Sequence, residues 1–420
     1  QVFGIKELWG IDFFWIAAIG LVVLTALYTI FGGMKSVLYT SVLQTPILLL
    51  GSLIILVLGF KELGGWDEMM RVCGAVTVND YGDTMTNLIR SNDDANFPWL
   101  GALIGSAIIG FWYWCTDQFI VQRVLSGKNE MEARRGTIFG AYLKLLPVFL
   151  FLIPGMIAFA LHQKYIGAGG EGFLPMLANG TANADAAFPT LVAKLLPAGV
   201  KGLVVCGILA ALMSSLASLF NSSAMLFTID FYKRFRPETP EKKLVGIGQV
   251  ATVVIVILGI LWIPIMRSVG DVLYTYLQDV QSVLAPGIAA AFLLGICWKR
   301  TSAQGGMWGL IAGMVIGLTR LGAKVYYSNA GEVADSTFKY LFYDMNWLFF
   351  CGWMFLFCII VVIVVSLATK APTAEKIQGL VFGTATKEQK AATRASWNHW
   401  DIIHTVIILA ITGAFYWYFW

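Results

Sequence analysis

The stretch FWYWCTDQFIVQRVLSGKN at residues 111–129 places polar groups inside a strongly apolar segment. Three adjacent aromatic residues, an aspartate and a glutamine precede an arginine and a lysine. An ionisable group inside a membrane helix costs roughly 2.5–3.5 kcal/mol on insertion scales, so such a group usually lines a cavity or pairs with a partner. The segment is therefore interpreted as the wall of a substrate pathway.

The composition of the 420 residues excludes an ordinary soluble domain. Hydrophobic residues make up 58% of the chain and charged residues only 13%. Apolar stretches of about 20 residues, long enough to cross the hydrocarbon core of a bilayer, recur along its whole length. The chain is predicted to be an all-α polytopic membrane protein. Its net charge of +4 is small and dispersed, so it indicates no nucleic-acid partner.

Ten membrane-spanning helices are predicted, at residues 14–31, 37–60, 98–122, 136–161, 201–229, 244–266, 273–297, 304–327, 345–369 and 401–420. Most of the 29 basic residues fall in one set of alternate loops, and mostly in short connections. The positive-inside rule makes these loops cytoplasmic. The protein is therefore placed in the plasma (inner) membrane as a multi-pass protein with an extracellular or periplasmic C-terminus.

Lys144 is the one basic residue that falls in neither set of loops. It is expected about eight residues into helix 136–161, or roughly 12 Å from the cytoplasmic end at 1.5 Å per residue. Asp117 has a similar depth in the preceding, antiparallel helix, so the two are predicted to form an ion pair. Two interpretations stay open: a structural pair between helices, or a polar cavity in which Lys144 also donates to substrate oxygens.

Trp112, Tyr113 and Trp114 lie near the middle of their predicted helix, whereas aromatic girdles normally lie at the membrane interfaces. A flat aromatic ring can cover the C–H face of a sugar or a planar ligand, and a tyrosine hydroxyl can act as a gate or a donor. Plain packing is the alternative for each of them.

Ala211, Ser214 and Ser215 share one helix face at positions i, i+3 and i+4. Hydroxyl oxygens and a freed backbone carbonyl suit Na⁺, as in the unwound helices of secondary transporters. Small residues at this spacing also allow helices to pack closely. The spacing alone favours packing.

A second polar cluster, Gln278 and Asp279, enters a helix shortly before Pro286-Gly287. A Gly/Pro interruption at membrane depth points to a binding site, which is the interpretation favoured for Gln278. For Asp279, a site and the water-exposed end of the helix are both open. Known enzyme signatures such as HExxH and a phosphate loop are missing, and the six cysteines do not indicate a disulfide framework. The three histidines are expected at interfaces.

These segments together resemble the sodium/solute symporter family, specifically its sodium–sugar (glucose/galactose and inositol) branch. The resemblance covers nearly the whole chain and includes WYWCTDQFIVQR at 112–123, GAYLKLLP at 140–147, AALMSSLASLFNSSAMLFTIDFYK at 210–233 and LAPGIAAAFLLGICWKR at 284–300. It implies a LeuT-type five-plus-five inverted-repeat bundle that works by alternating access, and no enzyme. Residues 1–300 would form the transporter core and residues 301–420 peripheral C-terminal helices.

The resemblance also implies a sugar site. Tyr113 corresponds to the inner-gate tyrosine, which closes the site from the cytoplasm. Trp114, Lys144 and Gln278 match sugar-binding positions, and Tyr274 is a further member of the set. The implied solute is a monosaccharide of the glucose/galactose type. Inositol, sialic acid or another polyol stays open, as does a non-coupled sugar sensor or channel on the same scaffold.

The implied cofactor is Na⁺, because Ala211, through its carbonyl, and Ser214 and Ser215 match half of the family's sodium site. The resemblance thereby overrides the preference for packing. Ser41 stands where the family often has an aspartate that builds a second sodium site. Serine cannot supply that charge, so one Na⁺ per sugar is expected.

The start of the chain is the second place where this sequence departs from the family pattern. The first predicted helix resembles the fourth core helix of the family, so the first helices of repeat one are expected to be absent. Gln1 in place of an initiator methionine agrees with a truncated start. Either the sequence omits the front of the protein, or this chain alone cannot transport.

Overall fold

The computed structural model describes residues 7–177, 180–267, 273–329 and 334–419. In these ranges nine helices are long and apolar enough to cross a membrane, and a bent pair of helices adds a tenth candidate. Each of the ten predicted spans has a counterpart among them, which confirms the all-α polytopic prediction. All six cysteines are free thiols, as expected.

The chain forms two compact units, each built from two separated stretches: Gln1–Val76 with Leu143–Val272, and Thr77–Tyr142 with Leu273–Trp420. The predicted division at residue 300 separates a transporter core from peripheral helices rather than compact units, and it stays a prediction. The first unit contains a hairpin of β1 (Glu7–Leu8) and β2 (Ile11–Asp12), then α1 (Phe13–Leu63), α2 (Trp66–Gly74), the π-helix η1 (Val148–Leu152), α6 (Ile153–Gly167), the short 3₁₀-helix η2 (Ala184–Ala186), α7 (Ala187–Leu195), α8 (Ala198–Met225), the π-helix η3 (Leu226–Tyr232), α9 (Lys233–Phe235) and α10 (Glu241–Arg267).

The second unit contains the other helices of the chain. They are α3 (Trp99–Cys115), α4 (Gln118–Leu125), most of α5 (Glu130–Pro147), α11 (Leu273–Cys297), α12 (Ala303–Asn329), α13 (Thr337–Lys339), the π-helix η4 (Tyr340–Asp344), α14 (Trp347–Ala368), α15 (Ala374–Ile377), α16 (Lys387–Ala395) and α17 (His399–Tyr418). The last residues of α5, from Leu143, belong to the first unit.

α1 is one continuous helix of 51 residues, where the sequence predicted two helices and a loop carrying Lys35. At 1.5 Å per residue it is about 76 Å long, against a hydrocarbon core of about 30 Å. Two stretches of it, Phe13–Gly32 and Gln44–Leu63, each have the length and hydropathy of a span. The Gly-Gly pair between them weakens a helix but removes no backbone donor, so the hydrogen-bond ladder can continue through it.

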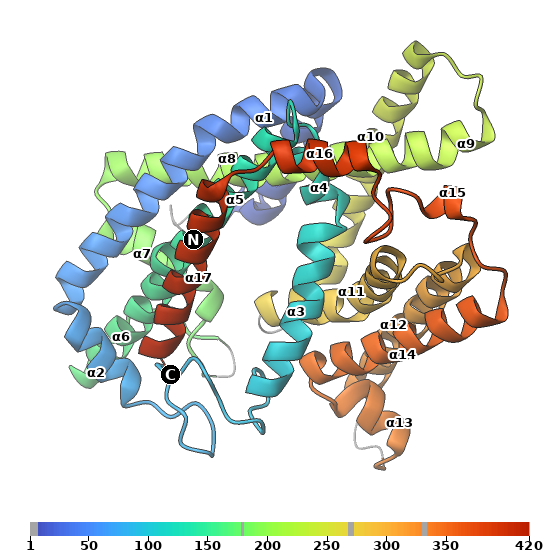
Figure 1. The fold of residues 1–420 in the computed structure, drawn as a ribbon. Helices are drawn as coiled ribbons and strands as arrows, with labels where there is room; N and C mark the ends of the chain where they lie inside the picture. The colour runs from blue at the N-terminus through green and yellow to red at the C-terminus, as the bar shows by residue number, and fades with distance from the viewer. Residues whose placement is uncertain (1–6, 178–179, 268–272, 330–333, 420) are drawn as a thin grey trace. The chain divides into compact units, whose positions relative to one another are not determined.

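The first unit is built around the contact of α1 with α8 (Figure 1). Glycines allow the two helices to approach closely: a Cβ at Gly51 would lie 2.7 Å from Val204 Cγ2, and one at Gly207 would lie 3.1 Å from Ile47 Cγ2. The expected interfacial position of His162, which lies near the end of α6, stays a prediction. His162 is only 3% exposed, and its Nδ1 accepts the backbone N–H of Leu174 at 3.0 Å.

In the second unit α11, α12 and α14 pack against one another, and α3 covers α11 and α14 (Figure 1). Gly287 and Gly313 bring α11 and α12 together, since a Cβ at Gly313 would lie 2.8 Å from the Gly287 Cα. α11 runs unbroken through Pro286, so the predicted interruption at Pro286-Gly287 is wrong. A proline removes one backbone donor, and close packing on two sides of α11 holds the helix together.

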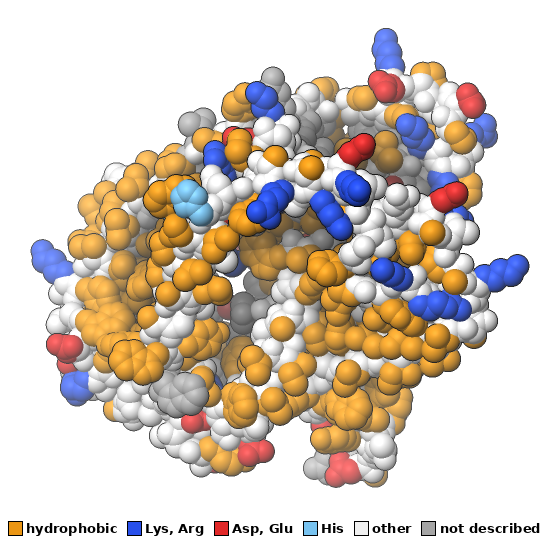
Figure 2. Space-filling view, in the orientation of Figure 1, with side chains coloured by type: hydrophobic (Ala, Val, Ile, Leu, Met, Phe, Trp, Pro, Cys, Tyr) orange, Lys and Arg blue, Asp and Glu red, His pale blue; other side chains and the backbone are white. Residues whose placement is uncertain are grey.

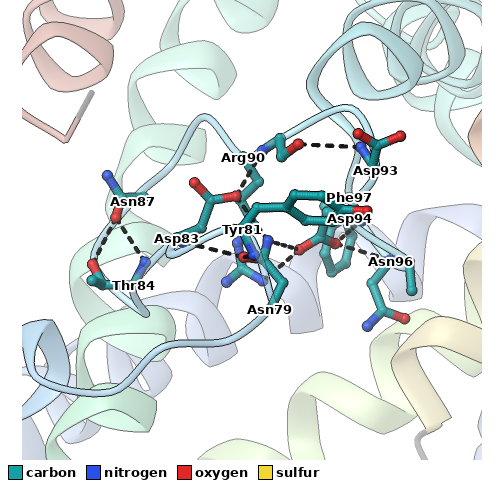
Figure 3. A network of polar contacts seen from close by, with 12 residues as sticks. Asn79, Tyr81, Asp83, Thr84, Asn87, Arg90, Asp93, Asp94, Asn96 and Phe97 are labelled. Carbon is teal, nitrogen blue, oxygen red and sulfur yellow. Dashed lines mark hydrogen bonds and ion pairs between the residues drawn. The ribbon is translucent and has the colours of Figure 1, made fainter.

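A loop between α2 and α3 is held by two aspartates (Figure 3). Asn79 Nδ2 donates to Asp83 Oδ2 at 2.8 Å and to Asp94 Oδ2 at 3.1 Å. Asp94 Oδ1 accepts the N–H groups of Asn96 and Phe97 at 2.9 and 2.7 Å. Burial would raise the pKa of Asp94, but these hydrogen bonds and Arg90 outweigh it and lower the pKa.

Candidate functional site

A hydroxyl pair lies at the centre of the α1–α8 contact in the first unit. The Oγ atoms of Ser41 and Ser214 lie 2.5 Å apart, and Ser214 is only 7% exposed. Next to it, the Tyr28 hydroxyl donates to the carbonyl of Met213 at 2.8 Å. Position 41, singled out from the sequence as the altered sodium position, therefore touches a predicted sodium ligand directly.

The other predicted sodium ligands lie on the same helix but differ in burial. Ser215 is exposed and Ala211 is partly buried. α8 is regular from Ala198 to Met225, so the expectation of a freed carbonyl at Ala211 is wrong. A carbonyl oxygen inside a helix keeps a second lone pair, so Ala211 still has an acceptor to offer.

Gln44 adds an oxygen that the sequence did not suggest as a ligand. It lies one helical turn after Ser41 on α1. Its Oε1 is buried and has no hydrogen-bond partner among the described residues. A buried acceptor without a donor costs about 1–3 kcal/mol, so an occupant that offers positive charge would be stabilised here. Its place in the segment YTSVLQT at residues 39–45, three residues after Ser41, was the sequence feature that could have indicated it as a ligand.

Lys144 lies in α5 one turn before a π-helix. α5 begins at Glu130, earlier than the predicted start at 136, and η1 follows directly after Pro147. π-bulges inside helices occur frequently at functional sites. The side chain of Lys144 is exposed within its unit. Its exposure is compatible with a solute ligand, and its role stays a prediction.

The aromatic residues form the end of α3 in the second unit. The rings of Trp112 and Tyr113 lie 6.1 Å apart, and those of Tyr113 and Trp114 lie 5.2 Å apart in an edge-to-face arrangement. Trp114 is 50% exposed, whereas Tyr113 is partly buried. The predicted helix 98–122 is broken directly after these residues, and α3 and α4 meet at a bend of 47°.

Asp117 explains the bend. It is the N-cap of α4, and its Oδ1 accepts the N–H of Phe119 at 3.0 Å. A carboxylate in this position stabilises the start of a helix. The predicted ion pair between Asp117 and Lys144 joins the two units and stays a prediction. Discontinuous helices form the substrate and ion sites of many secondary transporters.

Gln278 lies in the first turns of α11 and is partly buried. The side chain of Tyr274 lies outside the described residues, so its predicted role is neither supported nor contradicted. Between α3 and α11, Ile108 and Ile109 pack against Ala285 and Ala289. Tyr113 follows this contact by about one turn of α3, and Gln278 precedes it by about two turns of α11. Their convergence on one solute stays a prediction.

Asp279 belongs to a buried charge cluster that the sequence did not reveal. It is 14% exposed and pairs with Lys324 and, at 3.5 Å, with Arg320, both from α12. Arg320 is 1% exposed, donates to the Met345 carbonyl at 2.8 Å, and lies 4.0 Å over the Phe350 ring. Both basic residues fall inside the predicted span 304–327, and the sequence analysis did not single them out. Arg320 and Lys324 are four residues apart in one apolar helix, and this spacing predicts that they share one face of it.

The long apolar helices, with a broken helix and buried polar groups among them, place the protein in the class of polytopic helical membrane proteins. The chain belongs to the sodium:solute symporter family, whose family model matches residues 4–313. This confirms the resemblance found in the sequence and makes the protein a transporter and not an enzyme.

Curated relatives agree with this family. The chain is 35% identical to a sodium/mannose cotransporter of Bos taurus over 97% of this chain and 72% of the relative. It is 38% identical to sodium/glucose cotransporter 1 of Ovis aries over 86% of this chain and 57% of the relative. It is 35% identical to sodium/myo-inositol cotransporter 2 of Homo sapiens over 88% of this chain and 56% of the relative. The chain thus spans little more than half the length of the last two.

The fold also matches a solved structure, the substrate-bound outward-open state of a Na⁺-coupled sialic acid symporter. The TM-score is 0.65 at 20% sequence identity, over 89% of this chain and 70% of that chain. This likeness confirms the predicted LeuT-type helical bundle. The multi-pass membrane location follows from the family and the helices, and the side of the C-terminus stays a prediction.

Proposed function

We propose that this chain belongs to a Na⁺-coupled symporter of a monosaccharide of the glucose/galactose type, which works by alternating access. The observation that carries the proposal is the Ser41–Ser214 hydroxyl pair at the α1–α8 contact. The relatives named for sodium and glucose, mannose or myo-inositol support the substrate class.

Na⁺ would bind at the oxygens of Ala211, Ser214 and Ser215 on α8. Hydroxyl and carbonyl oxygens are ligands that suit a hard cation, and Ser214 is already shielded from solvent. A ligand shifts a conformational equilibrium only through its different affinity for the two states. Bound Na⁺ would therefore favour the outward-open state by stabilising the arrangement of α8 in that state.

The sugar would bind to Trp114, Lys144 and Gln278, with Tyr274 as a further contact. The ammonium group and the amide offer hydrogen bonds to hydroxyls, and the exposed indole offers a flat apolar face. Tyr113, in the turn before the α3–α4 bend, would close the site and release the sugar when it moves.

The direct test is counterflow uptake of labelled glucose and galactose by the full-length protein in proteoliposomes, with and without a sodium gradient. We expect uptake that requires Na⁺ and is inhibited by the unlabelled sugar. Uptake that is unchanged when choline replaces Na⁺ would instead favour a non-coupled channel or sensor. Inhibition by myo-inositol or sialic acid, but not by glucose, would reassign the solute within the same mechanism.

Variants of α8 test the ion site separately from the sugar site. S214A and S215A should weaken the apparent sodium affinity by roughly tenfold each, the loss expected for one ligand worth about 1.4 kcal/mol. S218A is the matched control, since Ser218 Oγ donates to the Ser214 carbonyl inside the helix and is not a predicted ligand. K144A and Q278A should reduce sugar uptake and raise the KM for sugar. Wild-type uptake in both would exclude these two residues from the site.

A further inference from the structure

A cavity of about 340 Å³ lies between the first turns of α17 and the middle of α5, and all its lining residues belong to the second unit. Tyr142 of α5 and His404 of α17 close it: the tyrosine hydroxyl lies 3.0 Å from His404 Nδ1, and the two rings meet edge to face. This cavity is separate from every residue assigned above to the ion and sugar sites.

The lining of the cavity runs along α5 and α17 from polar residues near the start of α17 to residues deeper in the two helices. Arg135 and Asn398 line it near the ends of the two spans, and Tyr142 and His404 line it further along the same helices. At 1.5 Å per residue, Tyr142 lies about 10 Å beyond Arg135, and His404 lies about 9 Å beyond Asn398. With Arg135 and Asn398 at the membrane boundary, the inner end of the cavity would lie at the depth of the first acyl carbons.

The outer part of the cavity carries one positive and one negative group. Neither Arg135 nor Asp401 takes part in an ion pair within the described part of the chain. Asp401 Oδ2 accepts the N–H of Asn398 at 3.0 Å as part of a capping box, which leaves Oδ1 as a further acceptor. A ligand that carries both a phosphate and an ammonium group would complement this pair, whereas a purely anionic ligand would meet an uncompensated carboxylate.

The apolar part of the lining suits acyl chains. Phe139 and Trp400 both line the cavity and are 63% and 56% exposed. Large aromatic residues at the membrane boundary contact both headgroups and the upper acyl chain. α16, which directly precedes α17, adds Lys387, Lys390 and Arg394, and basic side chains gather over it in Figure 2. They would attract phosphate groups to this side of the unit.

We propose that this cavity binds one aminophospholipid, with its phosphate at Arg135 and its primary ammonium group at Asp401. The acyl chains would lie along Phe139 and the lipid-facing side of α17. The Tyr142–His404 contact would form the floor, so that lipid binding would hold α17 against α5.

Native mass spectrometry of the delipidated protein tests this proposal with three lipids that share the same acyl chains. Phosphatidylethanolamine should form a one-to-one complex that survives more collisional activation than the complexes with phosphatidylcholine and phosphatidylglycerol. The quaternary ammonium of phosphatidylcholine cannot donate a hydrogen bond to Asp401, and phosphatidylglycerol has no ammonium group. Equal or tighter binding of either lipid would overturn the proposal.

R135Q and D401N locate the site. R135Q should weaken phosphatidylethanolamine binding roughly tenfold, the effect of losing one charge-assisted hydrogen bond. D401N keeps an oxygen for the helix cap and should remove the preference over phosphatidylcholine. R134Q is the matched control, because Arg134 is the adjacent residue of α5 and does not line the cavity. An equal loss in R134Q and R135Q, or no loss in R135Q, would overturn the proposal.

Discussion

The hydroxyl oxygens of Ser41 on α1 and Ser214 on α8 lie 2.5 Å apart, within the main helix contact of the first unit. One hydroxyl donates to the other, so the contact joins the two helices in a buried place without adding charge. A carboxylate at position 41 would put a negative charge at the same spot.

We therefore expect S41D to add a sodium-binding group next to Ser214. The dependence of sugar uptake on Na⁺ concentration should become steeper, with a Hill coefficient that rises from near one towards two. S41A is the control: it loses one hydrogen bond worth about 0.5–1.5 kcal/mol and should leave the steepness unchanged. A wild-type protein that already transports with two Na⁺ would contradict the expected stoichiometry.

Removing Asp279 should destabilise the second unit strongly. D279N leaves the guanidinium of Arg320, only 1% exposed, and the ammonium of Lys324 without their shared counter-ion. Breaking a buried ion pair costs roughly 3–5 kcal/mol. Equilibrium unfolding in mixed micelles should show this loss for D279N and a much smaller one for K324Q, in which Arg320 still neutralises Asp279. Equal stability of D279N and wild type would rule out a structural role for the cluster.

Close packing of α11 on α12 should not tolerate a methyl group at the contact. A Cβ at Gly313 would lie 2.8 Å from the Gly287 Cα, a backbone atom that cannot rotate away. We expect G313A to lower the free energy of unfolding by about 1–3 kcal/mol through overpacking. G322A, on the same helix, is the control because nothing lies within 4 Å of its Cβ. Thermal unfolding in detergent compares the two variants. A G313A protein as stable as G322A would show that α11 and α12 can move apart without a measurable loss of stability.

The loop between α2 and α3 should loosen in acid. The pKa of Asp94 is lowered in the folded protein, so its contribution to loop stability is present above the ordinary pKa of about 3.9 and is lost as the pH falls through the lower value. Amide hydrogen exchange of Asn96 and Phe97, corrected for intrinsic rates, should show protection at pH 7 that falls below about pH 4.

D94N should remove most of this protection already at neutral pH. D93N is the matched control, because Asp93 is exposed and its only described hydrogen bond is through its backbone N–H. Protection that does not change with pH in the wild type would mean that the backbone alone holds the loop.

The sequence by itself determined the spans, the class and the family. Twenty-residue apolar stretches, the asymmetry of basic loops and motifs such as WYWCTDQFIVQR are local in the chain, and the bilayer requires each stretch to satisfy its own backbone groups. The link between Ser41 and the sodium site could also be predicted from the sequence, because Ser41 stands in a short family motif that often carries a sodium-binding aspartate at this position.

Only the tertiary structure decided where helices bend and which polar groups meet. The sequence predicted a break at Pro286 and continuity at Asp117, and the structure has the reverse. A proline costs one hydrogen bond, which packing against two neighbouring helices can offset, whereas a side-chain cap from Asp117 lets a new helix start in another direction. Likewise Asp279 meets Arg320 although 41 residues separate them, because helix packing and not chain proximity brings their charges together.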